Sequence, residues 1–231
     1  MTPPKIIGLD ADDTLWHNET LFRLTHARFD ALLAPWADAA AVEDALAAVE
    51  RRNLGTYGYG AKGFTLSMLE TALELGQAQL PSAVLAEILT AGRDLMRHPI
   101  ALLPGVKETL PQLAAQARLV LVTKGDLFHQ ESKLAASGLG DHFTGVEIVS
   151  EKTVETYAKV FARYGAAAER AVMVGNSLRS DIWPALRAGA WAVHIRSEFE
   201  WARERAETPE GEPRFAALTQ FADLPEWLAR L

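Results

Sequence analysis

The stretch Ile6-Ile7-Gly8-Leu9-Asp10-Ala11-Asp12-Asp13-Thr14, close to the amino terminus, decides the fold. It opens with a short apolar run of the kind that fills a buried parallel strand. The run stops abruptly at three carboxylates, Asp10, Asp12 and Asp13. Capping of a following helix rarely needs so many acids so close together. The pattern therefore indicates a buried strand whose carboxyl end carries an acidic loop.

Further apolar runs also end in polar turns that carry glycine. Residues 119–122 lead into Thr123-Lys124-Gly125, and residues 171–174 lead into Gly175-Asn176-Ser177. Helical-looking stretches separate these runs, and such alternation is typical of βαβ units with a parallel sheet. We therefore expect an α/β fold, a doubly wound, Rossmann-like parallel sheet. Weaker strand candidates are residues 146–149 and 191–195, with a short edge strand and a terminal helix within 215–231.

Residues 16–102 separate the first two of these runs and differ in character from the rest of the chain. Their apolar residues recur at helical spacing, as when Val42, Leu46 and Val49 share one helix face. Proline and glycine punctuate the segment, with a long stretch between helices at 53–63. We expect a four-helix cap subdomain over 16–102, inserted into an α/β catalytic core made of residues 1–15 and 103–231.

Composition narrows the classes of function. The chain has 231 residues, 49% hydrophobic and 23% charged, which suits a globular domain. Its 23 Lys and Arg against 30 Asp and Glu give a net charge of −7, which argues against nucleic acid as a partner. Without cysteine, a metal must bind oxygen or imidazole ligands. No export signal and no membrane-length apolar run is visible, so we expect a cytoplasmic protein with no membrane partner.

The acidic loop has the residues for a cation site. On a regular strand Asp10 and Asp12 would point to the same face and repel each other, so the pair needs a cation or a proton. If the strand curls instead, the Asp10 carboxylate and the Asp12 main-chain oxygen face one point, and such an oxygen-rich pocket suits Mg²⁺. Carboxyl ends of neighbouring strands meet at one crevice, so we expect Thr123, Asn176 and Asp181 to join them.

The turn after the second strand and a later lysine suit an anionic ligand. Thr123 and Gly125 offer a hydroxyl and backbone N–H groups, although a plain strand-ending turn explains them equally well. Lys152 stands just before a helix expected to begin near Thr153, where a lysine reaches the crevice as a point charge for phosphate. Its rivals are Lys124, Lys133 and Lys159.

Three further segments carry weaker signals. Ser180 is the expected N-cap of the helix after Gly175, with Asp181 in the first turn. Residues 57–64 alternate tyrosine and glycine before Lys62, and predict either a substrate-selecting loop or a plain interhelical turn. Residues 196–214 are dense in Glu and Arg, which predicts a solvated segment without a catalytic role.

In their order, these motifs resemble those of the haloacid dehalogenase-like hydrolase superfamily. Asp-x-Asp-x-Thr follows the first strand, Thr-Lys-Gly follows the second, and a later lysine precedes Gly-Asn-Ser-x-x-x-Asp. The resemblance covers essentially the whole chain. It points to the phosphatase branch whose helical cap is inserted between the first and second motifs.

The resemblance implies a role for each matching residue. Asp10 is the expected nucleophile, and Asp12 the general acid that later takes a proton from water. Thr14 braces the first loop. The expected magnesium ligands are Asp10, Asp12, Asn176 and Asp181, and the expected phosphate-binding residues are Thr123, Lys124, Gly125 and Lys152. Two positions depart from the family pattern: Asp13 stands where glycine is frequent, and Asn176 stands where aspartate is common.

The function that follows is a Mg²⁺-dependent phosphatase acting on a small phosphorylated metabolite, a phosphate monoester, through an aspartyl-phosphate intermediate. Dehalogenases of the superfamily lack the second acid, so Asp12 favours phosphoryl transfer, and Lys62 is a candidate for substrate specificity. A phosphotransferase or mutase using the same intermediate is an alternative. A non-catalytic phosphate-binding protein is another, because Asn176 replaces an acidic ligand.

Overall fold

A parallel sheet forms the centre of the computed structural model, which describes residues 4–199 and 201–231. Its six strands lie in the order β3-β2-β1-β4-β5-β6, and every neighbouring pair is parallel. The predicted α/β doubly wound sheet is therefore confirmed. The strands are β1 (Ile6–Leu9), β2 (Arg118–Lys124), β3 (Phe143–Val149), β4 (Ala171–Gly175), β5 (Trp191–Ile195) and β6 (Phe215–Leu218).

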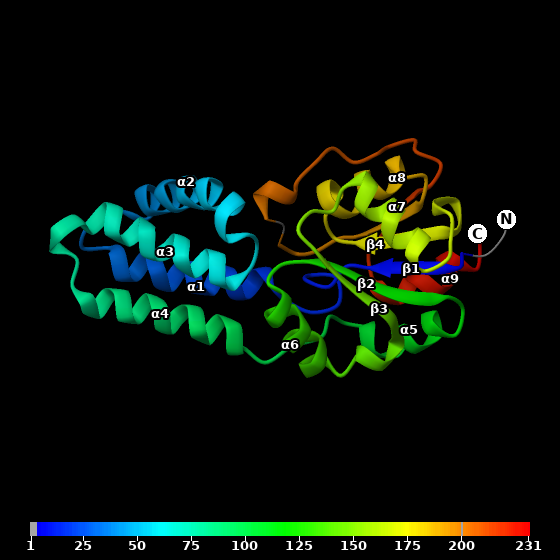
Figure 1. Cartoon of the computed structure of the whole chain (residues 1–231), viewed down its shortest axis with the longest axis horizontal. Coiled ribbons are helices and arrows are strands. Elements are labelled where there is room, and N and C mark those ends of the chain that lie inside the picture. Colours follow the sequence, from blue (N-terminus) through cyan, green and yellow to red (C-terminus); the bar gives the residue numbers. More distant parts are fainter. Residues whose placement is uncertain (1–3, 200) are drawn as a thin grey trace. The chain divides into compact units, whose positions relative to one another are not determined.

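Helices cover both faces of this sheet (Figure 1). Side chains alternate between faces along a strand, so Ile7 and Leu9 join one apolar cluster while Ile6 joins the other. The cluster with Ile7 includes side chains from α5 (Val106–Ala114), α6 (Leu127–Ser137) and α9 (Leu224–Leu228). The cluster with Ile6 includes side chains from α7 (Val154–Arg163) and α8 (Trp183–Arg187). The central strands β1, β2 and β4 are apolar and buried on both faces, as expected for a parallel sheet covered by helices on both sides.

The order of the strands determines which loops come together. The chain leaves β1 toward β2 on one side and later returns to β4 on the other, so the order reverses at β1. Leu9, the last residue of β1, is level with Leu121 in β2 and Val174 in β4. The loops after these strands consequently meet at the carboxyl edge of the sheet, where ligands bind in open α/β folds.

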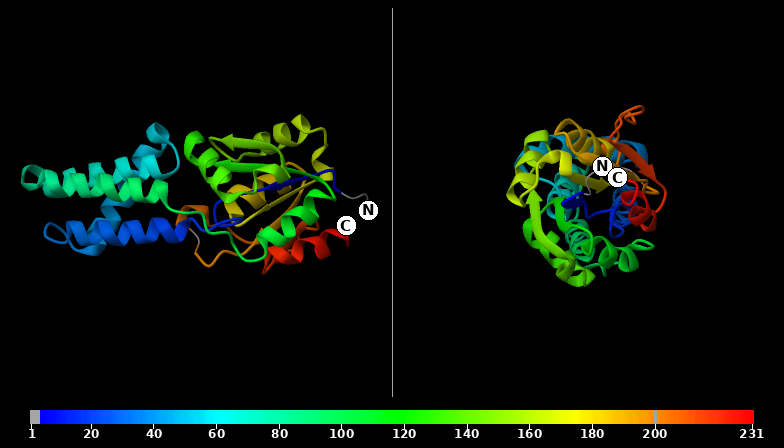
Figure 2. Two further views of the ribbon diagram at one scale, coloured as in Figure 1. Left: turned by 90° about the horizontal axis from the view of Figure 1, so that it is seen from below. Right: turned by 90° about the vertical axis from the view of Figure 1, so that its right-hand side faces the viewer.

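The chain divides into two compact units. One comprises residues 1–19, 100–124 and 130–231 and holds the sheet; the other comprises residues 20–99 and 125–129. The second unit holds four helices that pack side by side, as Figure 1 and Figure 2 show. Its core takes Phe29, Leu46, Met68 and Ile88 from successive helices. These helices are α1 (Glu19–Leu33), α2 (Ala39–Tyr57), α3 (Ala61–Gly76) and α4 (Ser82–Arg97).

The expected long stretch between helices at 53–63 is wrong. Helix α2 continues to Tyr57, and Asn53 is buried within it, where its amide donates to Ser67 Oγ at 3.3 Å. Only residues 58–60 separate α2 from α3. Gly58 and Gly60 have φ angles of 70° and 104°, a conformation that glycine adopts without strain. Lys62 therefore lies on α3 rather than in a loop.

Short helical turns complete the described chain. They are the 3₁₀ turns η1 (Gln77–Gln79), η2 (Gly140–His142), η3 (Ala168–Arg170), η5 (Ala202–Glu204) and η6 (Phe221–Asp223), and the π-helical turn η4 (Leu178–Ile182). Within residues 4–199 and 201–231, no helix has both the length and the apolar character needed to span a lipid bilayer.

Candidate active site

Asp10, Thr14 and Asn176 join the loops that follow β1 and β4. Asp10 is 6% exposed, and its main-chain N–H donates to Val174 O at 2.9 Å, which continues the parallel ladder. The Thr14 hydroxyl donates to Asp10 Oδ2 at 3.0 Å and accepts from the Asn176 N–H at 3.1 Å. Thr14 thus braces the loop between the two strands. Burial raises the pKa of Asp10 to about 7, against the opposing effect of the Lys152 ammonium.

Lys152 is the lysine that reaches Asp10. Its side chain is 2% exposed and donates to Asp10 Oδ1 and, at 2.6 Å, to Asp181 Oδ1. Burial alone would lower the pKa of Lys152, but these two carboxylates raise it above its usual value. Thr153 caps α7 by accepting from Thr156 N at 3.2 Å, so Lys152 lies directly before the helix. Of its rivals, Lys159 is exposed.

The helical turn after β4 begins three residues earlier than predicted. Ser177, not Ser180, is the N-cap: its hydroxyl accepts from Ser180 N at 2.8 Å, so the expectation for Ser180 is wrong. The Ser177 N–H donates to Asp181 Oδ2 at 2.9 Å. A serine cap reaches the N–H three residues later, which is the geometry seen here. At Gly175 an added Cβ would lie 2.2 Å from Asp181 Oδ2, so only glycine fits beside that carboxylate.

Three polar groups converge at this edge of the sheet: the Asp10 carboxylate, the Asp12 main-chain carbonyl and the Asn176 side-chain amide. With its nitrogen turned toward them, the Asn176 amide donates to Asp10 Oδ2 at 3.3 Å and to the Asp12 carbonyl at 3.2 Å. With its oxygen turned the same way, the three groups form an all-oxygen set of the kind that suits a hard cation. Among the described residues no cluster of three or more acidic or histidine side chains could hold a metal ion. This candidate set therefore depends on a main-chain carbonyl and an amide.

Asp181 is held differently from the other predicted metal ligands. One oxygen accepts from Lys152 and the other from the Ser177 N–H, and the side chain is fully buried. Tyr157, on α7, donates to the Ser180 carbonyl at 3.0 Å and packs beside this carboxylate. Asp181 as a metal ligand stays a prediction; its contacts in this structure orient Lys152.

The Asp12 side chain points to donors that the sequence analysis did not assign to it. Oδ1 accepts from Lys133 Nζ at 2.5 Å and from the Trp16 indole at 2.7 Å, and Oδ2 accepts from Gln130 Nε2 at 3.1 Å. Burial would raise the pKa of Asp12, but Lys133 and the other donors lower it below its usual value. The main-chain carbonyl and the carboxylate of Asp12 therefore serve different partners.

At the end of β2, Thr123 is buried and Lys124 is paired. Thr123 Oγ1 accepts from Gln130 Nε2 at 2.8 Å. The Lys124 ammonium contacts Glu204 Oε1 at 2.7 Å and Ser180 Oγ at 2.9 Å, so in this structure it is held by protein groups. Its contact with phosphate stays a prediction.

The prediction of a wholly solvated segment at 196–214 is wrong at Glu204. The Glu204 side chain, in η5, is 16% exposed. Besides the Lys124 ammonium, it accepts from the Ser177 hydroxyl at 2.5 Å through Oε2. Burial would raise its pKa, but the Lys124 charge lowers it below the usual value. Glu204 thereby links the turns after β2 and β4.

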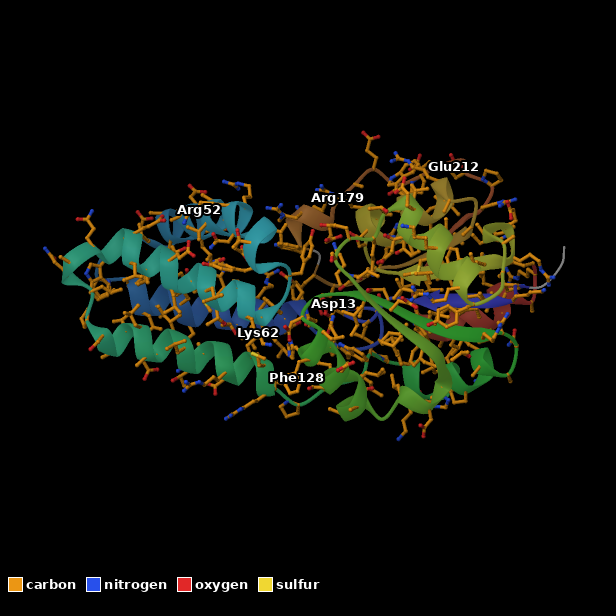
Figure 3. All side chains as sticks on the ribbon, viewed as in Figure 1. Asp13, Arg52, Lys62, Phe128, Arg179 and Glu212 are labelled. Carbon is orange, nitrogen blue, oxygen red and sulfur yellow. The ribbon has the colours of Figure 1, made fainter. Side chains whose placement is uncertain are left out.

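Lys62 and Gly125 belong to the helical unit. Lys62 Nζ lies 2.9 Å from Asp126 Oδ1 and 5.8 Å from the centroid of the exposed Phe128 ring, and Figure 3 labels Lys62 and Phe128. Asp126 also accepts from His129 N at 2.9 Å, near the start of α6. Gly125 has a φ angle of 131°, which suits glycine. Substrate selection by Lys62 and phosphate binding by Gly125 stay predictions.

Asp13, where the family pattern often has glycine, binds the main chain at residues 18 and 19, just after the acidic loop. Its φ of 59° is the left-handed conformation that Asp tolerates better than most residues. Its carboxylate, labelled in Figure 3, accepts from Asn18 N at 2.9 Å and from Glu19 N at 2.9 Å. Burial raises the pKa of Asp13 to about 7, although these N–H groups oppose the change. The Asp13 carboxylate thus satisfies the main-chain N–H groups of Asn18 and Glu19.

This fold, with an acidic loop, a buried lysine and a glycine-containing turn at one edge of the sheet, defines a class of α/β hydrolases. A model of the haloacid dehalogenase-like hydrolase family matches residues 4–189, and the chain belongs to this family. It is therefore a hydrolase enzyme.

Known proteins agree with this assignment. The chain is 41% identical to a haloacid dehalogenase-like family hydrolase from Xanthomonas campestris, with a TM-score of 0.88 over 100% of this chain and 96% of that one. It is 29% identical to phosphoserine phosphatase from Thermus thermophilus over 90% of this chain and 93% of that protein. L-2-haloacid dehalogenase from Xanthobacter autotrophicus shares the fold at 16% identity, with a TM-score of 0.65 and 98% of each chain covered.

Proposed function

We propose that the protein is a Mg²⁺-dependent phosphatase that hydrolyses a small phosphate monoester through an aspartyl-phosphate intermediate. The observation that carries the proposal is the arrangement of the two acids. Asp10 is held by Lys152 and Thr14, while the Asp12 carboxylate has its own set of donors beside it. Because the two carboxylates have separate hydrogen-bond partners, they can take two separate roles, nucleophile and general acid. The similarity to a protein named phosphoserine phosphatase supports the same class of reaction.

The residues beside Asp10 fit a magnesium ion. Asp10, the Asp12 carbonyl and the Asn176 amide oxygen would hold it, because hard cations prefer oxygen ligands and these groups converge in the structure. When bound, the ion supplies positive charge that lets an anionic nucleophile approach an anionic phosphoryl group. Asn176 is a neutral ligand, so we expect weaker magnesium binding than an aspartate would give.

The side chains then divide the reaction between them. A carboxylate oxygen of Asp10 attacks phosphorus, and the bond from phosphorus to the leaving oxygen breaks while Asp12 protonates that oxygen. Asp12, now a carboxylate, takes a proton from the water that cleaves the aspartyl-phosphate. Thr123 and Lys152 hold the phosphoryl oxygens. The Asp181 carboxylate keeps Lys152 beside Asp10.

Hydrolysis of phosphate and hydrolysis of a carbon–halogen bond can be separated by experiment. We expect the purified protein to release phosphate from 4-nitrophenyl phosphate with Mg²⁺ and not with EDTA, and to release no halide from a 2-haloacid. Asp10→Asn should abolish release, whereas Asp44→Asn, an exposed aspartate on α2, should leave it unchanged. Phosphate release that survives Asp10→Asn would contradict the assignment of Asp10 as the nucleophile. Halide release from the 2-haloacid would favour a dehalogenase.

Two alternatives use the same site. A phosphotransferase or mutase would pass the phosphoryl group from Asp10 to a substrate hydroxyl, and would give a phosphorylated acceptor instead of free phosphate. A non-catalytic binder would take up phosphate without turnover. A large gain in rate from Asn176→Asp would favour this last reading, whereas a loss would show that the amide belongs to a working site.

A further inference from the structure

The Asp12 side chain accepts hydrogen bonds from three residues that the proposed reaction does not use. Three of its donors come from two places: Trp16 from the same loop, and Gln130 and Lys133 from α6. Gln130 is 3% exposed and Lys133 is 8% exposed. A lysine is almost never buried to this extent unless it is paired. Lys133 is therefore buried because it pairs with Asp12, and this pair does not serve to make the surface soluble.

The donors are distributed unequally between the two oxygens. Oδ1 is fixed by the Lys133 ammonium at 2.5 Å and the Trp16 indole at 2.7 Å. Oδ2 has only the longer contact from Gln130 at 3.1 Å. A proton placed on Oδ1 would face two donors, whereas a proton on Oδ2 has room to point elsewhere. Oδ2 is thus the oxygen suited to give a proton to a leaving group.

Gln130 connects this acid to the phosphate end of the site. Its amide nitrogen also contacts Thr123 Oγ1 at 2.8 Å and the Lys124 carbonyl at 2.6 Å. One side chain from α6 therefore touches both Asp12 and the threonine expected to hold a phosphoryl oxygen. Both side chains come from α6, so this helix contacts the Asp12 carboxylate and Thr123 together.

We propose that Lys133 and Gln130 are positioning residues that orient the Asp12 carboxyl group, so that Oδ2 donates the proton to the leaving oxygen. This inference rests on the proposed phosphatase function. As the phosphorus–oxygen bond breaks, its electron pair goes to the leaving oxygen and the proton moves from Oδ2 to that oxygen. Negative charge then appears on Asp12, where the Lys133 ammonium and the Trp16 N–H already point. Donors fixed in advance at developing charge need no reorganisation during the reaction.

Dependence on the leaving group tests this role. An alkyl phosphate needs its leaving oxygen protonated, whereas 4-nitrophenolate leaves without a proton. We expect Lys133→Met to lower kcat/KM for an alkyl phosphate by about 10- to 100-fold, the scale of a misplaced catalytic group. It should lower kcat/KM for 4-nitrophenyl phosphate by less than about threefold, because kcat/KM reports the transfer to Asp10, and that transfer makes little use of the acid when the leaving group needs no proton. Gln130→Met should also lower kcat/KM more for the alkyl phosphate than for 4-nitrophenyl phosphate, on top of a loss common to both substrates because Gln130 contacts Thr123. This variant keeps the test valid if Lys133→Met folds poorly.

Glu131→Met is the matched control, because Glu131 is exposed on the same helix. It should change neither rate. Equal losses for both substrates, as a general folding defect produces, would overturn the positioning role, as would no loss at all. Wild-type protein that hydrolyses neither phosphate with Mg²⁺ would overturn the proposed function and this inference with it. An active wild-type protein with unselective variants would overturn this inference alone.

Discussion

The Lys152 ammonium pairs with two buried carboxylates, so its removal should have a large and specific cost. The side chain of Lys152 is 2% exposed, and those of Asp10 and Asp181 are 8% and 0% exposed. Breaking a buried ion pair by removing one partner costs about 3–5 kcal/mol, because the other charge stays buried without compensation. We expect Lys152→Met to lower the free energy of unfolding by this amount.

A double-mutant cycle isolates the cause. Asp181→Asn removes one of the two negative charges, so Lys152→Met should cost less in that background, with a coupling energy of about 1–3 kcal/mol. Urea unfolding in EDTA, followed by tryptophan fluorescence, measures these values, because Trp16 lies in the core of the unit that carries the site. Lys159→Met, at an exposed lysine on α7, is the matched control and should change stability by less than about 0.5 kcal/mol.

Two results would refute the reasoning. A cost below about 1 kcal/mol for Lys152→Met would be that of an exposed pair and would place the ammonium in solvent. Additive effects of Lys152→Met and Asp181→Asn would show that the two side chains do not interact, contrary to the 2.6 Å contact between them.

Three further substitutions test other parts of the structure. Gly175→Ala places a Cβ 2.2 Å from Asp181 Oδ2, so we expect the free energy of unfolding to fall by about 1–3 kcal/mol and kcat to fall as well. A variant as stable and as active as wild type would contradict this packing. Gly92→Ala places a Cβ 2.2 Å from Thr65 Oγ1, and its thermal midpoint should fall despite a gain in helix propensity of about 1 kcal/mol. The Glu204 pKa is lowered in the fold, so its contribution to stability is present above its unfolded pKa of about 4.3 and is lost as pH falls further. The difference in thermal midpoint between wild type and Glu204→Gln should shrink between pH 5 and about pH 3, and a constant difference would be inconsistent with this ion pair.

Residues at strand ends could be placed from the sequence because a single rule locates them. Apolar runs identified the strands, and the parallel order brings their carboxyl ends together, so Asp10 and Asn176 were expected at one edge of the sheet. The family resemblance added Thr14 and selected Lys152 from four candidate lysines. The structure brings these four together through direct hydrogen bonds. Hydrophobic periodicity also predicted the α/β class, since both faces of the central strands are buried.

Residues that reach the site from a helix side or a distant turn were harder to find. Gln130 and Lys133 are three positions apart on α6, directly after the Thr123 turn, and a polar pair on a buried helix face was the available signal. Glu204 gave no such signal, because the charges around it have no periodicity and only the fold brings it to Lys124. The N-cap at Ser177 was missed because two serines suited the same turn.

Asn176 illustrates how one departure from a family pattern can be compatible with the rest of a site. The Asp10 and Asp181 carboxylates share one ammonium, so this cluster already carries an excess negative charge. An aspartate at 176 would add a second carboxylate about 3.3 Å from Asp10 Oδ2, at the place of the amide. Like charges at that separation destabilise the fold unless a cation intervenes. With its nitrogen turned toward them, the amide satisfies Asp10 Oδ2 and the Asp12 carbonyl without a cation. If the proposed magnesium ion binds, the amide would turn its oxygen to the ion, so Asn176 would give weaker binding than aspartate in return for a site that is stable before the ion binds.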